Sequence, residues 1–405
     1  MTKRTPFAAL LADWRLRLRL ALLAGAAVAL AGCSTLPGWM VLQGRAAITD
    51  YRHFDNAGIA RAAEPSPLPA APQALRWPGG LDDAAAEADL AQRGTVALLV
   101  ARRGQLVYER YFNGYQRDSV ATSFSMAKSV LSLLLGQAIA EGRIAGVDDP
   151  LTRYLPELLD NDPRFARITL RHLLTMRSGI RFDESYGTPF SEAGRFYLAD
   201  DLKRQVAGLR IAREPDQAYA YSSGDSQLLG MAIERATSQP LAQLVEQRLW
   251  QPLGAQYDAS WSLDSAGHGV ARGFCCLNAR AVDYLRVGLM VLNEGRWNGR
   301  QVVPAEWLRL STAAQSGLPG ADDAARRNIE SPGTPKAAFY AWQWRRRPQP
   351  GSNPLQPGEA VYAQGLLGQF LYIDPPTQTV VLRLGQRGGD RPWPGWIEAL
   401  LQLNP

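Results

Sequence analysis

The hydrophobic residues of this 405-residue chain are arranged to predict strands near both ends and helices between them. Residues 95–100 and 105–112 are rich in apolar, β-branched and aromatic side chains, and they flank the turn-like pair Arg103-Gly104. This arrangement is typical of a β-hairpin. Further strands are predicted over residues 339–345, 369–374 and 379–384.

Helical patterns fill most of the remaining chain, with proline and glycine at their ends. The predicted helices cover residues 82–93, 125–140, 171–177, 226–249, 279–292 and 396–403. Strands at both ends around a helical middle indicate an α/β (α+β) fold, with an antiparallel sheet flanked by helices and an inserted, mostly helical lobe. We expect one domain over 81–405, with a sheet lobe of 81–148 and 337–405 and a helical lobe of 149–336. The polar stretch 316–337 predicts a mobile surface excursion.

The first 32 residues have the pattern of a secretory signal. A basic beginning is followed by a short apolar run that ends in Leu30-Ala31-Gly32-Cys33. This ending resembles a bacterial lipobox, which implies cleavage before Cys33, lipid attachment to its sulfur and a location in the cell envelope. Ser34, directly after Cys33, resembles the residue that sorts bacterial lipoproteins to the outer membrane. The anchored protein would then lie on the periplasmic side of that membrane. An ordinary signal or a membrane anchor with an incidental cysteine is the alternative, and residues 33–80, rich in Pro and Ala, predict a tether or arm.

Charge and cysteine content exclude several other classes of protein. The predicted signal holds five basic residues and Asp13, so it contributes +4 of the formal charge of +6. The remaining charge, near +2, does not support nucleic-acid binding. Cys275 and Cys276 are neighbours that cannot link distant segments, and we expect them to be two buried small side chains rather than a strained disulfide.

Lys128 is the most informative residue, because only Lys3, Lys128, Lys203 and Lys336 are lysines among 44 basic residues. Arginine keeps its proton in proteins, whereas a desolvated lysine can become a neutral amine and act as a base. Ser125 lies three residues earlier, so on a helix the two side chains share a face. The alternative is that Lys128 only extends its amine from an amphipathic helix.

A second candidate element is Tyr221-Ser222-Ser223, ahead of the predicted helix at 226. A tyrosine near a lysine can share its proton, and the Ser223 hydroxyl can relay it to a leaving group. An aromatic residue before a helix is more often a packing residue, but here it adjoins a run of small polar residues.

Five segments of the chain together resemble the class C β-lactamase-like serine hydrolases. They are Ser125-x-x-Lys128, Leu173 to Gly179, Tyr221-Ser-Ser-Gly-Asp, Gly273 to Asp283 and Ala363 to Gln369. The likeness, from His53 to the C-terminus, is greatest to the 6-aminohexanoate-dimer hydrolase branch. It implies a β-lactamase/transpeptidase-like fold, with Ser125 as the acylated nucleophile and Lys128 as its base. It also implies that Tyr221 shuttles protons, that Tyr186 contacts the amide substrate, and that the Leu366 backbone N–H stabilises the oxyanion. The Ser125 N–H, at the start of its helix, is a second such donor.

The chain departs from this family at Ala363-Gln364-Gly365. Penicillin-recognising relatives have Lys-Thr-Gly at this place, so the triplet supplies no cation for a substrate carboxylate. This favours linear amides or small esters over β-lactams and D-Ala-D-Ala peptides, although an arginine elsewhere could compensate. β-Lactamase and D,D-peptidase activity remain open, and so does a non-catalytic envelope lipoprotein that binds a ligand or partner.

The sequence gives little support for other kinds of catalytic, phosphate-binding or metal site. The chain has no Gly-x-Ser-x-Gly elbow, no phosphate-binding glycine loop and no histidine pair with metal-ligand spacing. We therefore expect no metal and no cofactor. His172 is expected to be structural, His268 a loop residue, and Arg345-Arg346-Arg347 a solvated strand end. The oligomeric state stays open.

Overall fold

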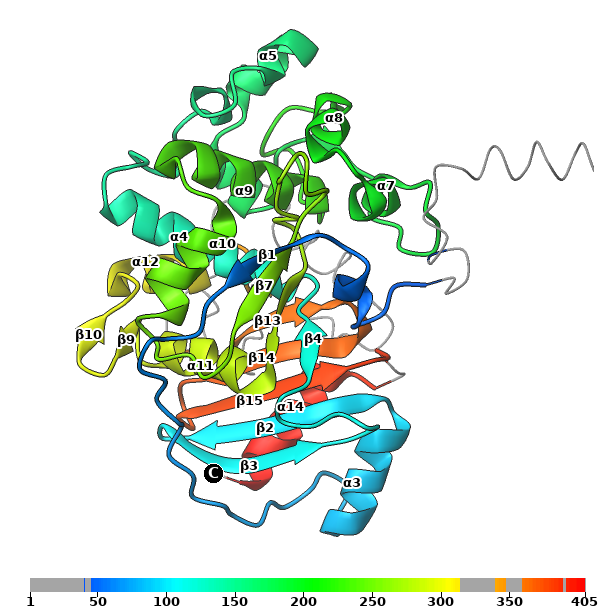
Figure 1. Ribbon diagram of the computed structural model, residues 1–405, viewed down its shortest axis with the longest axis vertical. Coiled ribbons are helices and arrows are strands. Elements are labelled where there is room, and N and C mark those ends of the chain that lie inside the picture. Colours follow the sequence, from blue (N-terminus) through cyan, green and yellow to red (C-terminus); the bar gives the residue numbers. More distant parts are fainter. Residues whose placement is uncertain (1–39, 41–44, 314–338, 347–358, 389–390, 405) are drawn as a thin grey trace, which may run out of the picture. The chain divides into compact units, whose positions relative to one another are not determined.

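The computed structural model describes residues 40, 45–313, 339–346, 359–388 and 391–404 (Figure 1). The predicted signal segment with Cys33 and the polar stretch 316–337 lie outside these residues. The chain divides into two units, Met1–Ala46 and Ala47–Pro405, and all elements below belong to the second. Within the described ranges, no helix combines the length and apolar character needed to cross a membrane.

The larger sheet has seven strands in the order β11-β12-β13-β14-β15-β2-β3, and every neighbouring pair is antiparallel (Figure 1). Its strands come from both ends of the chain, so the predicted architecture is confirmed. The strands are β2 (Thr95–Arg102), β3 (Gln105–Tyr111), β11 (Phe339–Tyr340), β12 (Arg345–Arg346), β13 (Val361–Gly365), β14 (Gln369–Asp374) and β15 (Thr379–Gly385). The prediction of a single strand over 339–345 is wrong, because the chain turns back between β11 and β12, which pair with each other.

The predicted hairpin is formed by β2 and β3. Arg103 and Gly104 connect the strands with φ angles of 50° and 79°. A two-residue turn whose residues both have positive φ matches the right-handed twist of the strands, and glycine adopts this conformation without steric cost.

Helices cover both faces of this sheet. On one face, α3 (Asp83–Gln92) and α14 (Trp393–Leu403) pack on alternate strand residues such as Leu98, Val100 and Tyr372. On the other face lies α11 (Ala281–Leu292), where Gly288 permits a close approach. A Cβ at Gly288 would come within 2.7 Å of side-chain atoms of Leu371 and Val380.

A second, four-stranded antiparallel sheet was not predicted. Its order is β1-β7-β8-β4, and its strands are β1 (Asn56–Ile59), β4 (Val120–Thr122), β7 (Ala259–Ser262) and β8 (Leu277–Arg280). Each strand has only three or four residues, which is too short for a period of two to be visible in the sequence. The described residues also form two two-stranded ribbons: β5 (Ile180–Arg181) with β6 (Arg210–Ile211), and β9 (Arg296–Trp297) with β10 (Arg300–Gln301).

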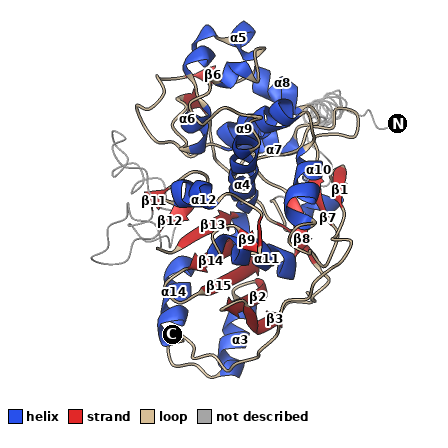
Figure 2. Ribbon diagram, turned by 90° about the vertical axis from the view of Figure 1, so that its left-hand side faces the viewer, coloured by secondary structure: helices blue, strands red, loops and turns tan. Residues whose placement is uncertain are grey.

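The inserted lobe is mostly helical. In the described part of this lobe, the α-helices besides α11 are α5 (Leu158–Asn161), α6 (Leu170–Leu174), α7 (Glu192–Leu198), α8 (Leu202–Ala207), α9 (Ser223–Thr237), α10 (Leu241–Val245) and α12 (Ala305–Thr312). Helix α4 (Met126–Ala140) of the sheet lobe packs beside α9 between the two lobes (Figure 2). These two helices carry the residues singled out in the sequence.

The predicted bounds of α9, 226–249, are wrong at both ends. The helix begins at Ser223 because the Ser222 hydroxyl accepts a hydrogen bond from the Asp225 N–H at 3.1 Å, which is a typical N-cap. It ends at Thr237, where Ser238 has a φ of 54° and Pro240 follows. The π-helical turn Glu246–Trp250 then continues α10.

Candidate active site

Ser125 and Lys128 lie at the first turn of α4. The preceding residue, Phe124, has a φ of 44° and turns the chain sharply between the end of β4 and the helix. Non-glycine residues adopt this left-handed conformation at a cost, and such residues are frequent at functional sites. Ser125 consequently occupies the N-cap position and remains partly exposed, while the Lys128 side chain is only 1% exposed.

Three oxygen atoms surround the Lys128 amine. Its Nζ donates hydrogen bonds to Ser125 Oγ at 3.0 Å, Ser223 Oγ at 3.1 Å and the Phe274 carbonyl oxygen at 2.8 Å. Within the described part of the chain, Lys128 forms no ion pair. The amine is therefore held by uncharged groups only, with the Ser125 hydroxyl at hydrogen-bond distance.

Tyr221 contacts the amine through its ring. Lys128 Nζ lies 5.1 Å from the ring centroid of Tyr221, and Tyr340 packs edge-on against the same ring at 6.0 Å between centroids. Among the described residues, no hydrogen bond joins the Tyr221 hydroxyl to Lys128 or Ser125. The structure thus brings Ser125, Lys128, Tyr221 and Ser223 together, with the phenol beside the amine rather than bonded to it.

Glu184, in the loop between β5 and α7, reaches the same group and was missed in the sequence. Its carboxylate accepts hydrogen bonds from Ser223 Oγ at 2.5 Å and from the Ser223 backbone N–H at 2.7 Å. The Tyr186 hydroxyl also donates to it. The only sequence signal was its place two residues before Tyr186, in a loop whose contacts cannot be read from a pattern.

Tyr186 is 53% exposed, and its hydroxyl points back to Glu184. Desolvation of that hydroxyl, followed by the negative charge of Glu184, raises the pKa of the Tyr186 phenol well above its ordinary value. Tyr186 therefore stays protonated and lies at the rim of the site.

The C-terminal end of β13 borders the nucleophile. A Cβ at Gly365 would lie 2.2 Å from the Ser123 carbonyl oxygen, so only glycine allows this strand to lie against the segment that leads to Ser125. Leu366 and Gln364 flank this contact. Within the described ranges, neither the Ser125 nor the Leu366 backbone N–H has a protein acceptor.

The interpretation of Arg345-Arg346-Arg347 as a solvated strand end is wrong for Arg346, which is buried, whereas Arg345 is partly exposed. Strand β12 pairs with β11 along one edge and with β13 along the other. Arg346 is 1% exposed and pairs with Glu359 at 3.2 Å. The Arg345 guanidinium lies 5.1 Å from the Tyr221 ring centroid and 5.7 Å from that of Tyr340, which places a cation beside the candidate site.

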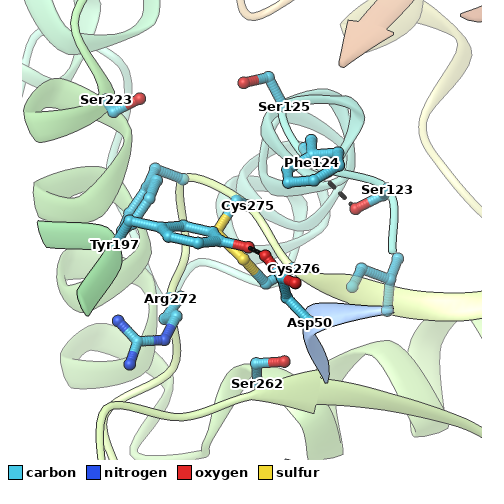
Figure 3. The surroundings of a disulfide bond; sticks show 12 residues. Asp50, Ser123, Phe124, Ser125, Tyr197, Ser223, Ser262, Arg272, Cys275 and Cys276 are labelled. Atoms are coloured by element: carbon cyan, nitrogen blue, oxygen red, sulfur yellow. Dashed lines mark hydrogen bonds between the residues drawn. A yellow bond between two sulfur atoms is a disulfide. The ribbon is translucent and has the colours of Figure 1, made fainter. Parts of the chain in front are cut away.

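Cys275 and Cys276 form a disulfide between neighbours, so the expectation of two separate side chains is wrong, although both are buried. Cys276 has a φ of 71°, in the left-handed region. Figure 3 shows this disulfide together with the Tyr197 hydroxyl, which donates to Asp50 at 2.7 Å. The disulfide directly follows Phe274, whose carbonyl binds Lys128.

The histidines lie in other surroundings. His172 Nδ1 accepts from the Thr169 N–H at 3.0 Å, and its Nε2 lies 3.3 Å from Asp216. His268 has ligand atoms within 4.8 Å of those of Asp201 and Asp264. However, the Asp264 carboxylate already accepts the backbone N–H groups of Leu202 and Val270, and Asp201 caps α8. We assign these three residues a structural role.

Comparison with known proteins agrees with this arrangement. A family model described as "Beta-lactamase" matches residues 83–403. The 6-aminohexanoate-dimer hydrolase of Paenarthrobacter ureafaciens is 27% identical over 315 residues, which is 74% of either chain. Esterase EstB of Burkholderia gladioli is 32% identical over 209 residues, covering 46% of this chain and 51% of the esterase.

Solved structures share the fold. A Bacillus anthracis structure named for 6-aminohexanoate-dimer hydrolysis has a TM-score of 0.72 at 23% identity, covering 87% of this chain and 92% of its own. A class C β-lactamase has a TM-score of 0.58 at 14% identity, covering 78% and 94%. The chain belongs to the β-lactamase family and is a serine hydrolase.

Proposed function

We propose that this protein hydrolyses amide or ester bonds through an acyl-serine intermediate on Ser125. The observation that carries the proposal is the 3.0 Å contact between Ser125 Oγ and the buried amine of Lys128. A nucleophile within hydrogen-bond reach of a base is the arrangement that acyl transfer requires.

The first half of the reaction follows from this contact. Lys128 Nζ takes the hydroxyl proton as Ser125 Oγ attacks the substrate carbonyl carbon, and the carbonyl oxygen gains the negative charge. The backbone N–H groups of Ser125 and Leu366 are the donors proposed for this oxyanion. Loss of one such donor typically costs about a hundredfold to a thousandfold in rate.

The second half returns the proton. The tetrahedral intermediate collapses and expels the alcohol or amine, which receives the proton from Lys128 by way of the Tyr221 phenol. Water then attacks the acyl-serine ester while the same groups accept its proton, and release of the acid restores the Ser125 hydroxyl.

The proposed substrates are linear amides, such as 6-aminohexanoate oligomers, or small esters. The names of two relatives, the 6-aminohexanoate-dimer hydrolase and the esterase, support this class, as does the absence of a lysine in Ala363-Gln364-Gly365. Tyr186 at the rim is the proposed contact to the substrate amide.

Hydrolysis of β-lactams or D-Ala-D-Ala peptides is a second candidate, because Arg345 is a cation that can compensate for the lysine missing from Ala363-Gln364-Gly365. Its guanidinium lies beside Tyr221, on the side from which the leaving group is protonated. A carboxylate on the leaving group would find its counter-ion there, whether the substrate is a linear amide or a β-lactam.

A fluorophosphonate probe tests the enzyme against a non-catalytic binder. We expect labelling of the wild-type protein and none of Ser125→Ala. Absence of labelling in the folded wild-type protein would instead support the binder. Turnover of nitrophenyl esters, aminohexanoate amides, nitrocefin and D-Ala-D-Ala peptides then separates the substrate classes.

We also propose that the mature protein is anchored by a lipid on Cys33 at the periplasmic side of the outer membrane. The lipobox-like sequence and Ser34 support this. Membrane fractionation tests it: Cys33→Ala is expected to move the protein out of the membrane fraction, and an unchanged distribution would contradict the anchor.

A further inference from the structure

Glu184 ends a chain of hydrogen bonds that begins at the nucleophile. Ser125, Lys128 and Ser223 are joined by contacts of 3.0 and 3.1 Å, and Ser223 continues to Glu184 at 2.5 Å. Ser223 is only 2% exposed, so its hydroxyl has little access to solvent.

The carboxylate fixes the direction of these bonds. An ionised carboxylate can only accept, so the Ser223 hydroxyl must donate its one proton to Glu184. The Ser223 oxygen then has only lone pairs to offer Lys128. The Phe274 carbonyl oxygen, 2.8 Å from Nζ, is likewise an acceptor only.

This direction determines where the lone pair of Lys128 points. A neutral amine has two N–H bonds and one lone pair. Ser223 and Phe274 take the two N–H bonds, which leaves the lone pair for the third neighbour, Ser125 Oγ. In this state the Ser125 hydroxyl donates its proton towards the base, as acylation requires.

We propose that Glu184 is a positioning residue that orients the Ser223 hydroxyl and thereby directs the lone pair of Lys128 at Ser125. Its role corresponds to that of the third residue of a catalytic triad, which orients the base without touching the substrate. The inference rests on the proposed function of Ser125 and Lys128. Without the carboxylate, the Ser223 hydroxyl can turn and donate to Lys128, where it competes with Ser125 for the lone pair.

Glu184→Gln tests the proposal, because glutamine keeps the shape but can present either a donor or an acceptor to Ser223. The measurement is the rate of acylation by an uncharged nitrophenyl ester, which has no ammonium group that Glu184 could bind directly. We expect a loss in kcat/KM of about tenfold or more, carried by the acylation rate with KM nearly unchanged. Removal of a general base itself typically costs about a hundredfold to ten-thousandfold.

A double-mutant cycle tests whether Glu184 affects the acylation rate through Ser223. If Glu184 acts through Ser223, the variant with both Glu184→Gln and Ser223→Ala is no slower than Ser223→Ala alone. Glu192→Gln is the matched control: this carboxylate accepts the Asp183 N–H of the same loop at 3.0 Å and makes no contact with Ser223. Glu184→Asp keeps the acceptor character and is expected to recover part of the rate.

Three results would overturn the inference while the proposed function stands: a Glu184→Gln variant as fast as the wild type, a change confined to KM, or losses that multiply in the double variant. If the wild-type protein is not acylated at all, the proposed function fails and the inference fails with it. Far-UV circular dichroism of each variant separates these outcomes from unfolding.

Discussion

Lys128 and Arg272 are two basic residues near the candidate site that are equally buried but have different roles. Each is 1% exposed. Arg272 donates to the carbonyl oxygens of Phe196 and Ala199, both at 2.8 Å, and lies 4.3 Å from the Phe54 ring centroid. Like Lys128, it forms no ion pair within the described residues.

The difference between them lies in the head group. A guanidinium offers five N–H donors and no lone pair, so Arg272 can only hold backbone carbonyls in place. Burial lowers the pKa of Arg272 to about 10, so it still stays protonated at neutral pH. A lysine in such a setting can surrender a proton and expose a lone pair to a hydroxyl. Similar burial thus gives a structural cation in one case and the proposed base in the other.

Lys128→Arg is the strongest test of this comparison. The variant keeps a cation with donors for Ser223 and Phe274, but it has no lone pair for Ser125. We expect acylation by a fluorophosphonate or nitrophenyl ester to fall by about a hundredfold to ten-thousandfold, with secondary structure retained. A variant that still acylates at the wild-type rate would show that no base is needed at this position.

Arg272→Met is expected to have the opposite profile. Methionine fills part of the space but leaves the carbonyls of Phe196 and Ala199 without donors, which costs about 1–3 kcal/mol for each buried group. Urea unfolding should therefore show a loss of about 3 kcal/mol, while kcat per folded molecule stays close to the wild-type value. A large fall in kcat without a loss of stability would contradict the structural role.

Asp225 extends the comparison to a buried acid in α9. It is 0% exposed and accepts a hydrogen bond from Ser178 Oγ at 2.7 Å. Burial raises the pKa of the Asp225 carboxyl to about 7, against the hydrogen bonds from Ser178 and Ser222. The folded state therefore binds this proton more tightly than the unfolded state does.

The sign of the pH effect follows from that raised pKa. The contribution of Asp225 to stability is fully present below about pH 4, is lost as the pH rises to about 7, and is absent above that. Asp225→Asn carries no proton to lose, so we expect it to be more stable than the wild type at pH 8, by a few degrees in Tm, with a flatter profile between pH 4 and 7. Thermal melts across this range check the prediction, and an unchanged difference between variant and wild type at all pH values would contradict it.

The pairing of Ser125 with Lys128 could be predicted because it depends only on helical spacing, and Tyr221 with Ser223 because they adjoin a helix start. Glu184 and Arg345 could not be predicted in the same way. Glu184 reaches Ser223 from a loop 39 residues away, and Arg345 reaches Tyr221 only through the pairing of β12 with β13. In the main sheet, the long strands β2, β3, β14 and β15 could be predicted from their apolar, β-branched and aromatic residues. Strands β11 and β12 and the sheet β1-β7-β8-β4 could not, because their strands are too short to leave a pattern.

Arg345 gives the comparison its third cation, and its proposed task is to bind an anion rather than to hold carbonyls or move a proton. Arg345→Gln should raise KM about tenfold, the equivalent of about 1.4 kcal/mol, for an amide or ester with a carboxylate on its leaving group. Arg345→Gln should hydrolyse an uncharged analogue of the same length as well as the wild-type protein does. Arg345→Lys should recover part of the loss with the charged substrate, because lysine keeps the charge without the bidentate geometry. Equal losses for the charged and the uncharged substrate would show instead that the guanidinium acts by packing against Tyr221 and Tyr340, as Arg272 packs against Phe54.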